Sequence, residues 1–182
     1  MREIEIKAHA RDEKSVRAYF DAHCGAGHEV HKTDHYFRRP GAFVQALRIR
    51  EHKGIIEFTC KKTSSSPEGE KNEEYEFQAP ADEIEKSSSF FHALGFEDFF
   101  IKKKDGWEWM DGDAHVELLS VNDLGWFLEI EILLPFGSSD DEAEEARKRI
   151  DAIMKNAGVS RSDYEMKSYR EMILGSEYGI QG

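Results

Sequence analysis

Residues 3–7 read Glu3-Ile4-Glu5-Ile6-Lys7, a strict alternation of charged and apolar side chains. Side chains of a β-strand point to opposite faces with a period of two residues. The run therefore predicts a strand that carries isoleucine on one face and only ionised groups on the other.

The same alternation returns along the chain. Leu47-Arg48-Ile49-Arg50 and Leu128-Glu129-Ile130-Glu131 each place two like charges opposite apolar neighbours. Breaks such as Pro40-Gly41 and Lys53-Gly54 are typical of turns between antiparallel strands. Other charged or polar pairs on one strand face are Thr59 with Lys61, Glu74 with Glu76, and Lys102 with Lys104. Strand after strand thus offers one apolar and one charged face.

Helices interrupt these strands. Asp12 is a favourable N-cap, and Ser138 or Ser139 precedes an acidic first turn. The serine-rich stretch 63–71 predicts a mobile hairpin loop. The predicted helices span 12–23, 80–95, 139–157 and 163–174, and the predicted strands span 3–7, 36–37, 43–51, 55–61, 72–77, 99–104, 107–110, 115–121 and 126–134. About eight strands dominated by hairpins, with helices between them, predict an α+β fold.

The composition fits one globular domain over residues 1–182. The 25 Lys or Arg and 37 Asp or Glu residues give a net charge of −12, which disfavours duplex nucleic acid as a partner. No run of about 18 apolar residues occurs, so we expect no membrane span, and the charged start is unlike a signal peptide. The two cysteines, Cys24 and Cys60, favour a reduced, cytoplasmic protein.

The charged strand faces admit two interpretations. A charged face is usually the solvent-exposed side of an antiparallel sheet whose other face packs on the core. Here these faces hold Glu, Arg and Lys with little neutral polar material, which favours a sheet closed into a barrel with its apolar faces outward beneath the helices. Charges inside such a lumen must be paired or occupied. Carboxylates suit a divalent metal and Arg and Lys suit phosphate, so we expect a small polyanionic phosphate as ligand.

Several of these runs resemble the motifs of one family, in the order in which the family has them. Glu3-Ile4-Glu5-Ile6-Lys7 resembles the ExExK signature of CYTH domains, the triphosphate tunnel metalloenzymes. The other similar runs are Asp34-His35-Tyr36-Phe37 (DxYF), Leu47-Arg48-Ile49-Arg50 (LRIR), Phe58-Thr59-Cys60-Lys61 (LTxK), Glu74-Tyr75-Glu76 (ExE), Lys102-Lys103-Lys104 (KxR), residues 124–131 (LGxFxEIE) and Lys167-Ser168-Tyr169-Arg170 (K/R-SY). The resemblance covers nearly the whole chain.

The resemblance implies a closed eight-stranded antiparallel β-barrel, with helices packed outside, whose lumen binds a triphosphate. Members include class IV adenylyl cyclases, thiamine triphosphatases and inorganic triphosphatases. By position, Lys7 is expected close to the attacked phosphorus, with Glu5 as a second catalytic residue. The implied ligands of Mg²⁺ or Mn²⁺ are Glu3, Glu5, Glu129 and Glu131, with Glu74 and Glu76 nearby, and the implied phosphate ligands are Arg48, Arg50, Lys61, Lys102 and Lys104.

Two positions depart from the family pattern. Leu119 stands where the family often has an aspartate that contributes to metal binding. Glu117 lies two residues away and hence on the same strand face, so it is expected to compensate, or else one metal position is weakened. Lys104 stands in place of an arginine and lacks the planar two-donor fork.

These patterns leave three functions open. The leading hypothesis is metal-dependent hydrolysis of inorganic tripolyphosphate or of a nucleoside or thiamine triphosphate, in which a metal-bound water attacks the terminal phosphorus. The nearest alternative is a class IV cyclase that converts ATP to cyclic AMP and pyrophosphate. The third is a non-catalytic polyphosphate-binding module, which Leu119 makes conceivable. The expected partner is a small triphosphate, without a nucleic acid duplex or a membrane, and the chain is expected to be a monomer or homodimer.

Overall fold

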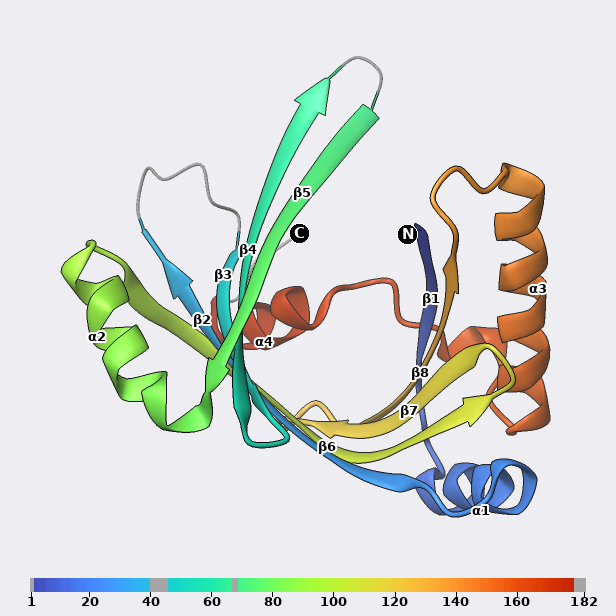
Figure 1. Cartoon of the computed structure of the whole chain (residues 1–182). Helices are drawn as coiled ribbons and strands as arrows, with labels where there is room; N and C mark the ends of the chain where they lie inside the picture. Colours follow the sequence, from blue (N-terminus) through green and yellow to red (C-terminus); the bar gives the residue numbers. More distant parts are fainter. Residues whose placement is uncertain (1, 40–45, 67–68, 179–182) are drawn as a thin grey trace. The chain divides into compact units, whose positions relative to one another are not determined.

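A computed structural model describes residues 2–39, 46–66 and 69–178 (Figure 1). Of the side chains within strands and helices, those of Ala46, residues 61–66 and 69–74, and residues 176–178 lie outside this description. The chain forms two compact units. Unit 1 comprises residues 1–30 and 104–182, and unit 2 comprises residues 31–103.

Eight strands form one antiparallel sheet in the order β1-β8-β7-β6-β2-β3-β4-β5. The strands are β1 (Arg2–His9), β2 (His28–Arg38), β3 (Ala46–His52), β4 (Ile55–Ser66), β5 (Gly69–Pro80), β6 (Glu97–Asp111), β7 (Ala114–Val121) and β8 (Trp126–Leu134). This confirms the α+β fold and the antiparallel sheet that the alternation predicted.

The sheet is open, so the prediction of a closed barrel was wrong. β1 and β5 stand at the two ends of the strand order, and no ladder joins them within the described ranges. Alternation determines which side chains share a face, because that depends only on neighbouring residues. Closure depends instead on strand tilt and on the stagger between edge strands, which a single-strand pattern does not contain.

Local capping explains where the helices begin. The helices are α1 (Glu13–Cys24), α2 (Ile84–Ala93), which follows a 3-10 turn over Ala81–Glu83, α3 (Asp140–Asn156) and α4 (Tyr169–Tyr178). Asp12 accepts a hydrogen bond from the Ser15 amide, and Ser139 forms a capping box with Glu142. None of the described helices is long and apolar enough to cross a bilayer.

The last predicted helix, 163–174, differs from the structure. A 3-10 turn covers Arg161–Asp163, and α4 begins at Tyr169. The Ser168 hydroxyl accepts a hydrogen bond from the Glu171 amide, while the Glu171 carboxylate accepts from the Ser168 amide and hydroxyl. This reciprocal cap starts a new helix at Tyr169, which explains the interruption.

In unit 1 the apolar faces of β1, β7 and β8 pack against helices. Ile4 and Ala8 of β1 and Ile130 of β8 share a core with Ile150 and Met154 of α3. α3 lies alongside β1 and β8 in Figure 1, and contacts both strands. The face of β1 and β8 opposite this core therefore carries Glu3, Glu5, Lys7, Glu129 and Glu131.

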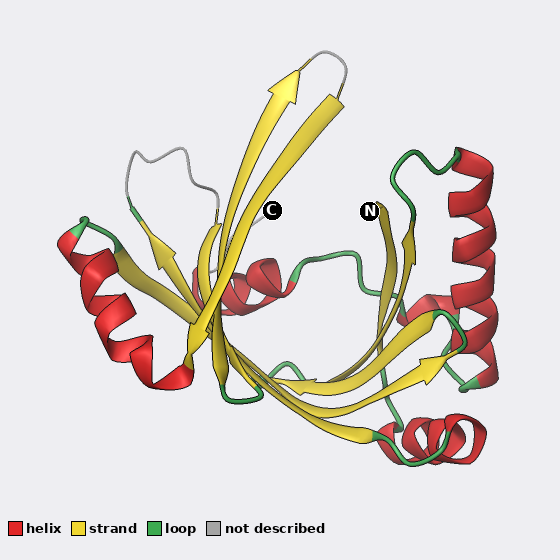
Figure 2. Ribbon diagram, in the orientation of Figure 1, coloured by secondary structure: helices red, strands yellow, loops and turns green. Residues whose placement is uncertain are grey.

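Unit 2 repeats this arrangement with a smaller core. Ile49 of β3 and Ile56 and Phe58 of β4 are buried, and Ile84 and Phe91 of α2 pack against them. Figure 2 shows α2 beside these strands. The opposite face of β3 carries Arg48 and Arg50. Both units therefore confirm that the apolar strand faces lie under helices.

One predicted break between strands, at residues 105–106, lies inside a continuous strand. Asp105-Gly106 was expected to be a turn, yet β6 runs unbroken from Glu97 to Asp111. A Cβ at Gly106 would lie 2.0 Å from the Leu118 carbonyl oxygen, so glycine permits close strand approach there. The hairpin loop expected over 63–71 is shorter than predicted, because the ladder of β4 and β5 continues from Thr63 opposite Asn72 to Ser66 opposite Gly69; residues 67 and 68 lie outside the described part of the chain.

Candidate active site

Three glutamates converge on the charged face of β1 and β8. Glu5 lies directly opposite Glu131 in the ladder, and Glu3 is two residues from Glu5 on the same face. One carboxylate oxygen from each residue lies within 4.8 Å of the other two. Partial burial raises the pKa of Glu3 to about 7, with further contributions from its hydrogen bond with Glu5 and from the charge of Glu131. A divalent cation would relieve this repulsion.

Glu129, by contrast, binds a cation of the chain itself. The Lys104 ammonium lies 3.0 and 2.7 Å from its two carboxylate oxygens, and the Tyr169 hydroxyl donates a hydrogen bond to one of them. All three residues are buried. Burial raises the pKa of Tyr169 well above its usual range, and the charge of Glu129 adds to this. Tyr169 is therefore a neutral donor, and Glu129 belongs to a lysine–carboxylate–tyrosine group.

Lys7 lies beside this group. It is opposite Glu129 in the ladder of β1 and β8, and its ammonium lies 4.2 Å from the centre of the Tyr169 ring. The same ammonium donates a hydrogen bond to the Lys167 carbonyl oxygen. Burial lowers the pKa of Lys7, and the nearby charges of Glu129 and Glu5 oppose that effect. The first strand thus presents a cation next to the glutamate cluster.

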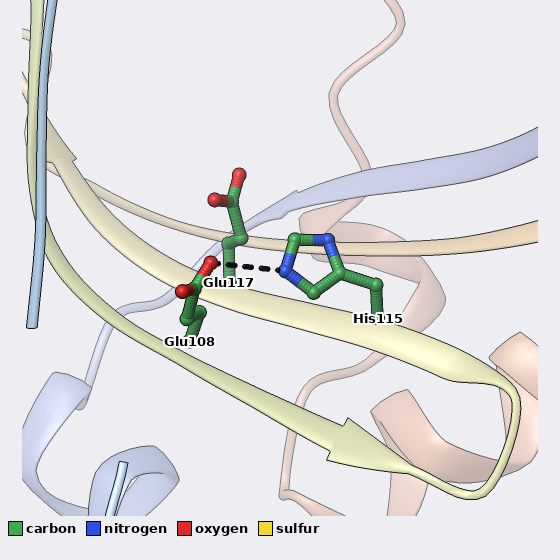
Figure 3. Close-up of side chains that lie close together, drawn as sticks. All are labelled: Glu108, His115 and Glu117. Carbon is green, nitrogen blue, oxygen red and sulfur yellow. Dashed lines mark hydrogen bonds and ion pairs between the residues drawn. The ribbon is translucent and has the colours of Figure 1, made fainter. Parts of the chain in front are cut away.

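A second cluster occupies the neighbouring hairpin of β6 and β7. Figure 3 shows the side chains of Glu108, His115 and Glu117 close together. The His115 imidazole contacts the Glu108 carboxylate on one side and that of Glu131 on the other. Its hydrogen bond with Glu131 raises the pKa of His115, and that with Glu108 acts in the same direction, against burial.

The sequence argument missed His115 and Glu108. The signal was present, because His115 is two residues before Glu117 and so shares its strand face. Glu108 lies opposite Glu117 across the Asp111-Gly112 turn, which alternation alone did not reveal. Pairing each predicted hairpin residue by residue would have identified both.

In unit 2 a buried aspartate anchors two of the expected phosphate ligands. Arg50 contacts both oxygens of Asp34, at 2.6 and 2.9 Å, and the Lys102 ammonium lies 3.0 Å from one of them. Burial alone would raise the pKa of Asp34, but the Arg50 hydrogen bond and the Lys102 charge hold it well below its usual range. Asp34 was not predicted as a site residue, although it lies opposite Arg50 in the ladder of β2 and β3.

Arg48 lies on the same face of β3 as Arg50, and one of its N–H donors has no acceptor among the described residues. Its Nη2 atom donates hydrogen bonds to Thr59 at 2.7 Å and to Glu57 at 3.4 Å, and lies 3.9 Å from an oxygen of Glu76. Its Nε atom is buried and has no hydrogen-bond partner among the described residues. A buried donor without an acceptor is costly, so this N–H fits an anionic ligand.

The remaining predicted residues divide into two groups. The side chains of Lys61 and Glu74 lie outside the described part of the structure, although their backbones pair across β4 and β5. Leu119 is fully buried on β7, opposite Gly106 and Phe127 in the two flanking ladders. An apolar side chain therefore fills the position at which the resemblance implied an aspartate, on the same strand face as Glu117.

The profile of the CYTH domain matches residues 1–169. The chain belongs to the CYTH family. No curated protein matches the sequence. Membership implies a divalent metal ion, and the Glu3–Glu5–Glu131 cluster fits one, because its oxygen ligands lie together and the neighbouring carboxylates raise the pKa of Glu3.

Solved structures share the CYTH fold over nearly the whole chain. The PH1819 protein of Pyrococcus horikoshii is 23% identical, with a TM-score of 0.73 and coverage of 96% of this chain and 99% of that one. A candidate adenylate cyclase from Vibrio parahaemolyticus is 20% identical, with a TM-score of 0.71 and coverage of 94% and 97%. HpAC1 from Hippeastrum, a candidate adenylyl cyclase with a dominant triphosphatase activity, is 16% identical, with a TM-score of 0.60 and coverage of 96% and 94%.

Proposed function

We propose that this CYTH protein is a divalent-metal-dependent triphosphatase that releases phosphate from tripolyphosphate or from a nucleoside or thiamine triphosphate. The observation that carries the proposal is the glutamate cluster of β1 and β8, which lies beside the ammonium of Lys7 on one charged strand face. Carboxylates that bind Mg²⁺ or Mn²⁺ next to a lysine suit a substrate that is itself polyanionic.

The metal would be held by Glu3, Glu5 and Glu131. When bound, a divalent ion polarises phosphoryl oxygens and lowers the pKa of a coordinated water. Lys7 would neutralise charge on the phosphoryl group that is attacked, and burial strengthens that interaction. Lys104, held against Glu129, would orient that carboxylate toward its neighbours on the same strand face.

Arg48, Arg50 and Lys102 would bind the phosphate oxygens. The orphaned Nε of Arg48 supports this role, because a phosphate oxygen would supply the acceptor that the described residues lack. Asp34 would hold Arg50 and Lys102 in place, because its carboxylate contacts both cations.

Two other outcomes have a specific motivation. HpAC1 is described as a candidate adenylyl cyclase with a dominant triphosphatase activity. This motivates cyclisation of ATP as the second candidate reaction. In a cyclase the ribose 3′-hydroxyl would attack the α-phosphorus and pyrophosphate would leave. Leu119, apolar and buried at a family metal position, motivates the third outcome, which is binding without turnover.

One substrate panel tests the proposal. The purified protein is incubated with tripolyphosphate, ATP or thiamine triphosphate, each with Mg²⁺ or Mn²⁺, and orthophosphate, pyrophosphate and cyclic AMP are measured. We expect orthophosphate from at least one substrate and none without metal. Cyclic AMP with pyrophosphate would identify the cyclase instead, and tight binding without any product would identify a binding module.

A further inference from the structure

The hairpin of β6 and β7 brings one imidazole and two carboxylates to a single strand face. Glu108 and Glu117 are directly opposite each other in the ladder, and His115 lies two residues before Glu117. In Figure 3 the Glu108 carboxylate and the His115 imidazole face each other, and the side chain of Glu117 lies beside them. One ligand atom from each lies within 4.8 Å of the other two. This set differs in chemistry from the Glu3–Glu5–Glu131 cluster, because it contains a nitrogen donor.

The two nitrogens of His115 have different surroundings. Nδ1 lies 3.2 Å from Oε1 of Glu131, and Nε2 lies 3.2 Å from Oε2 of Glu108. A metal-binding histidine typically donates its second ring N–H to a carboxylate, which fixes the tautomer and orients the ring. Glu131 can serve as that acceptor. The Nε2 lone pair would then point to the side where Glu108 and Glu117 lie.

The spacing and the burial suit an ion. Ligand atoms on opposite sides of a metal bound at about 2.0–2.2 Å are about 4 to 4.4 Å apart, so small rotations of the glutamate side chains would complete the site. Glu117 is buried, and the side chains of Glu108 and His115 are 18% and 28% exposed. A small pocket adjoins the cluster and is lined by Glu5, His115, Glu117, Glu129 and Glu131.

We propose that Glu108, His115 and Glu117 form a metal site in which Nε2 of His115 is a direct ligand of a divalent transition metal. The inference deepens the proposed function, on which its catalytic relevance rests, by adding a second metal site that has a nitrogen ligand. Binding of the metal itself does not require turnover.

A nitrogen ligand changes which metal is bound. Mg²⁺ prefers oxygen ligands in near-ideal octahedral geometry, whereas divalent ions of the first transition row accept an imidazole nitrogen more readily. The site is therefore expected to bind Mn²⁺ more tightly than Mg²⁺. The competing explanation is a protonated His115 that simply bridges Glu108 and Glu131, in which case no metal approaches its nitrogen.

The test uses the full chain and Mn²⁺ alone, without any phosphate. Bound Mn²⁺ is quantified from the loss of the free-ion EPR signal, and pulsed EPR reports whether ¹⁴N couples to the bound ion. We expect ¹⁴N coupling in the wild-type protein. His115→Gln should lose the coupling and bind Mn²⁺ at this site at least about tenfold more weakly, whereas an ion at the Glu3–Glu5–Glu131 cluster has oxygen ligands and gives no ¹⁴N coupling. Glu108→Gln should bind more weakly but keep the coupling.

A matched control is His92→Gln on α2, where the imidazole also lies beside a carboxylate, Asp98, at 3.1 Å. This variant should keep both the coupling and the Mn²⁺ affinity, and circular dichroism verifies that each variant is folded. Bound Mn²⁺ without ¹⁴N coupling in the wild type, or no Mn²⁺ binding, overturns the site. The substrate panel is read separately, so a protein with ¹⁴N coupling but no turnover would refute the proposed function and leave the metal site standing.

Discussion

The Tyr169 hydroxyl donates a hydrogen bond to the Glu129 carboxylate, which also binds the Lys104 ammonium. The centre of the same tyrosine ring lies 4.2 Å from the ammonium nitrogen of Lys7 and 4.8 Å from that of Lys104. One buried side chain from α4 therefore contacts both lysines and the glutamate between them. This arrangement ties the C-terminal helix to the charged face of β1 and β8.

The first prediction concerns the two parts of Tyr169. Tyr169→Phe removes the hydroxyl and keeps the ring, so Glu129 loses one donor while both ammonium–ring contacts remain. Loss of a hydrogen bond to a charged group should lower the free energy of unfolding by about 1.5–3 kcal/mol. Tyr169→Leu should lower turnover further, because it also removes the cation–π contacts. Denaturant unfolding and phosphate release measure the two effects.

Tyr164→Phe is the control for this prediction. Its hydroxyl also donates to a carboxylate, that of Asp151, but on a different part of unit 1. We expect a comparable loss of stability and unchanged turnover. Equal turnover in Tyr169→Phe and Tyr169→Leu would show that the ring contacts of Lys7 and Lys104 do not matter for the reaction.

The second prediction isolates the spare donor of Arg48. Arg48→Lys keeps the charge but removes the buried Nε–H and the planar fork. Calorimetry with tripolyphosphate should show affinity weaker by about tenfold or more, as expected for a lost charge-assisted hydrogen bond of about 1.5–3 kcal/mol. Arg38→Lys is the matched control, because Arg38 is half exposed and lies near Glu97. Unchanged affinity in Arg48→Lys would remove Arg48 from the phosphate site.

The third prediction follows from the raised pKa of Glu3, about 7 in the folded protein against 4.5 for the ordinary side chain. Between these values the folded state holds a proton that the unfolded state has released. The contribution of Glu3 to stability is therefore present below about pH 4.5 and is lost as the pH rises through about 7. The melting temperature of Glu3→Gln, relative to wild type, should accordingly rise across this interval.

Metal and an exposed glutamate provide the controls for that pH profile. A cation at the Glu3–Glu5–Glu131 cluster favours the ionised form, so Mn²⁺ should stabilise the wild type more at pH 8 than at pH 5. Glu85→Gln on α2 should leave the profile unchanged, because that side chain is exposed. If the melting temperatures of the wild type and Glu3→Gln differed by the same amount at every pH from 4.5 to 7, the raised pKa of Glu3 would be contradicted.

Local patterns predicted the strand faces, because alternation depends only on neighbouring residues. Ile4 and Ile49 accordingly lie under helices, while Glu5 and Arg50 lie on the charged faces. Features that depend on strand register were missed. The Asp34–Arg50 ion pair and the Glu108–Glu117 pair each require knowledge of which residues are opposite each other across two strands. Barrel closure was expected wrongly for a related reason, since it depends on the pairing of edge strands far apart in sequence.

Gly106 illustrates the same limit and gives the last prediction. Asp105-Gly106 matches a turn in sequence, but the glycine sits inside β6 because the backbone of β7 approaches it closely. Gly106→Ala would place a Cβ 2.0 Å from the Leu118 carbonyl oxygen, so the two strands must separate. We expect a loss of about 1–3 kcal/mol in the free energy of unfolding. Gly175→Ala in α4 is the control, because the added Cβ meets no atom within 4 Å beyond its chain neighbours and the backbone of its own helix, and alanine favours the helix by about 1 kcal/mol. Urea unfolding that ranks Gly106→Ala equal to or more stable than Gly175→Ala would contradict the close packing of β6 on β7.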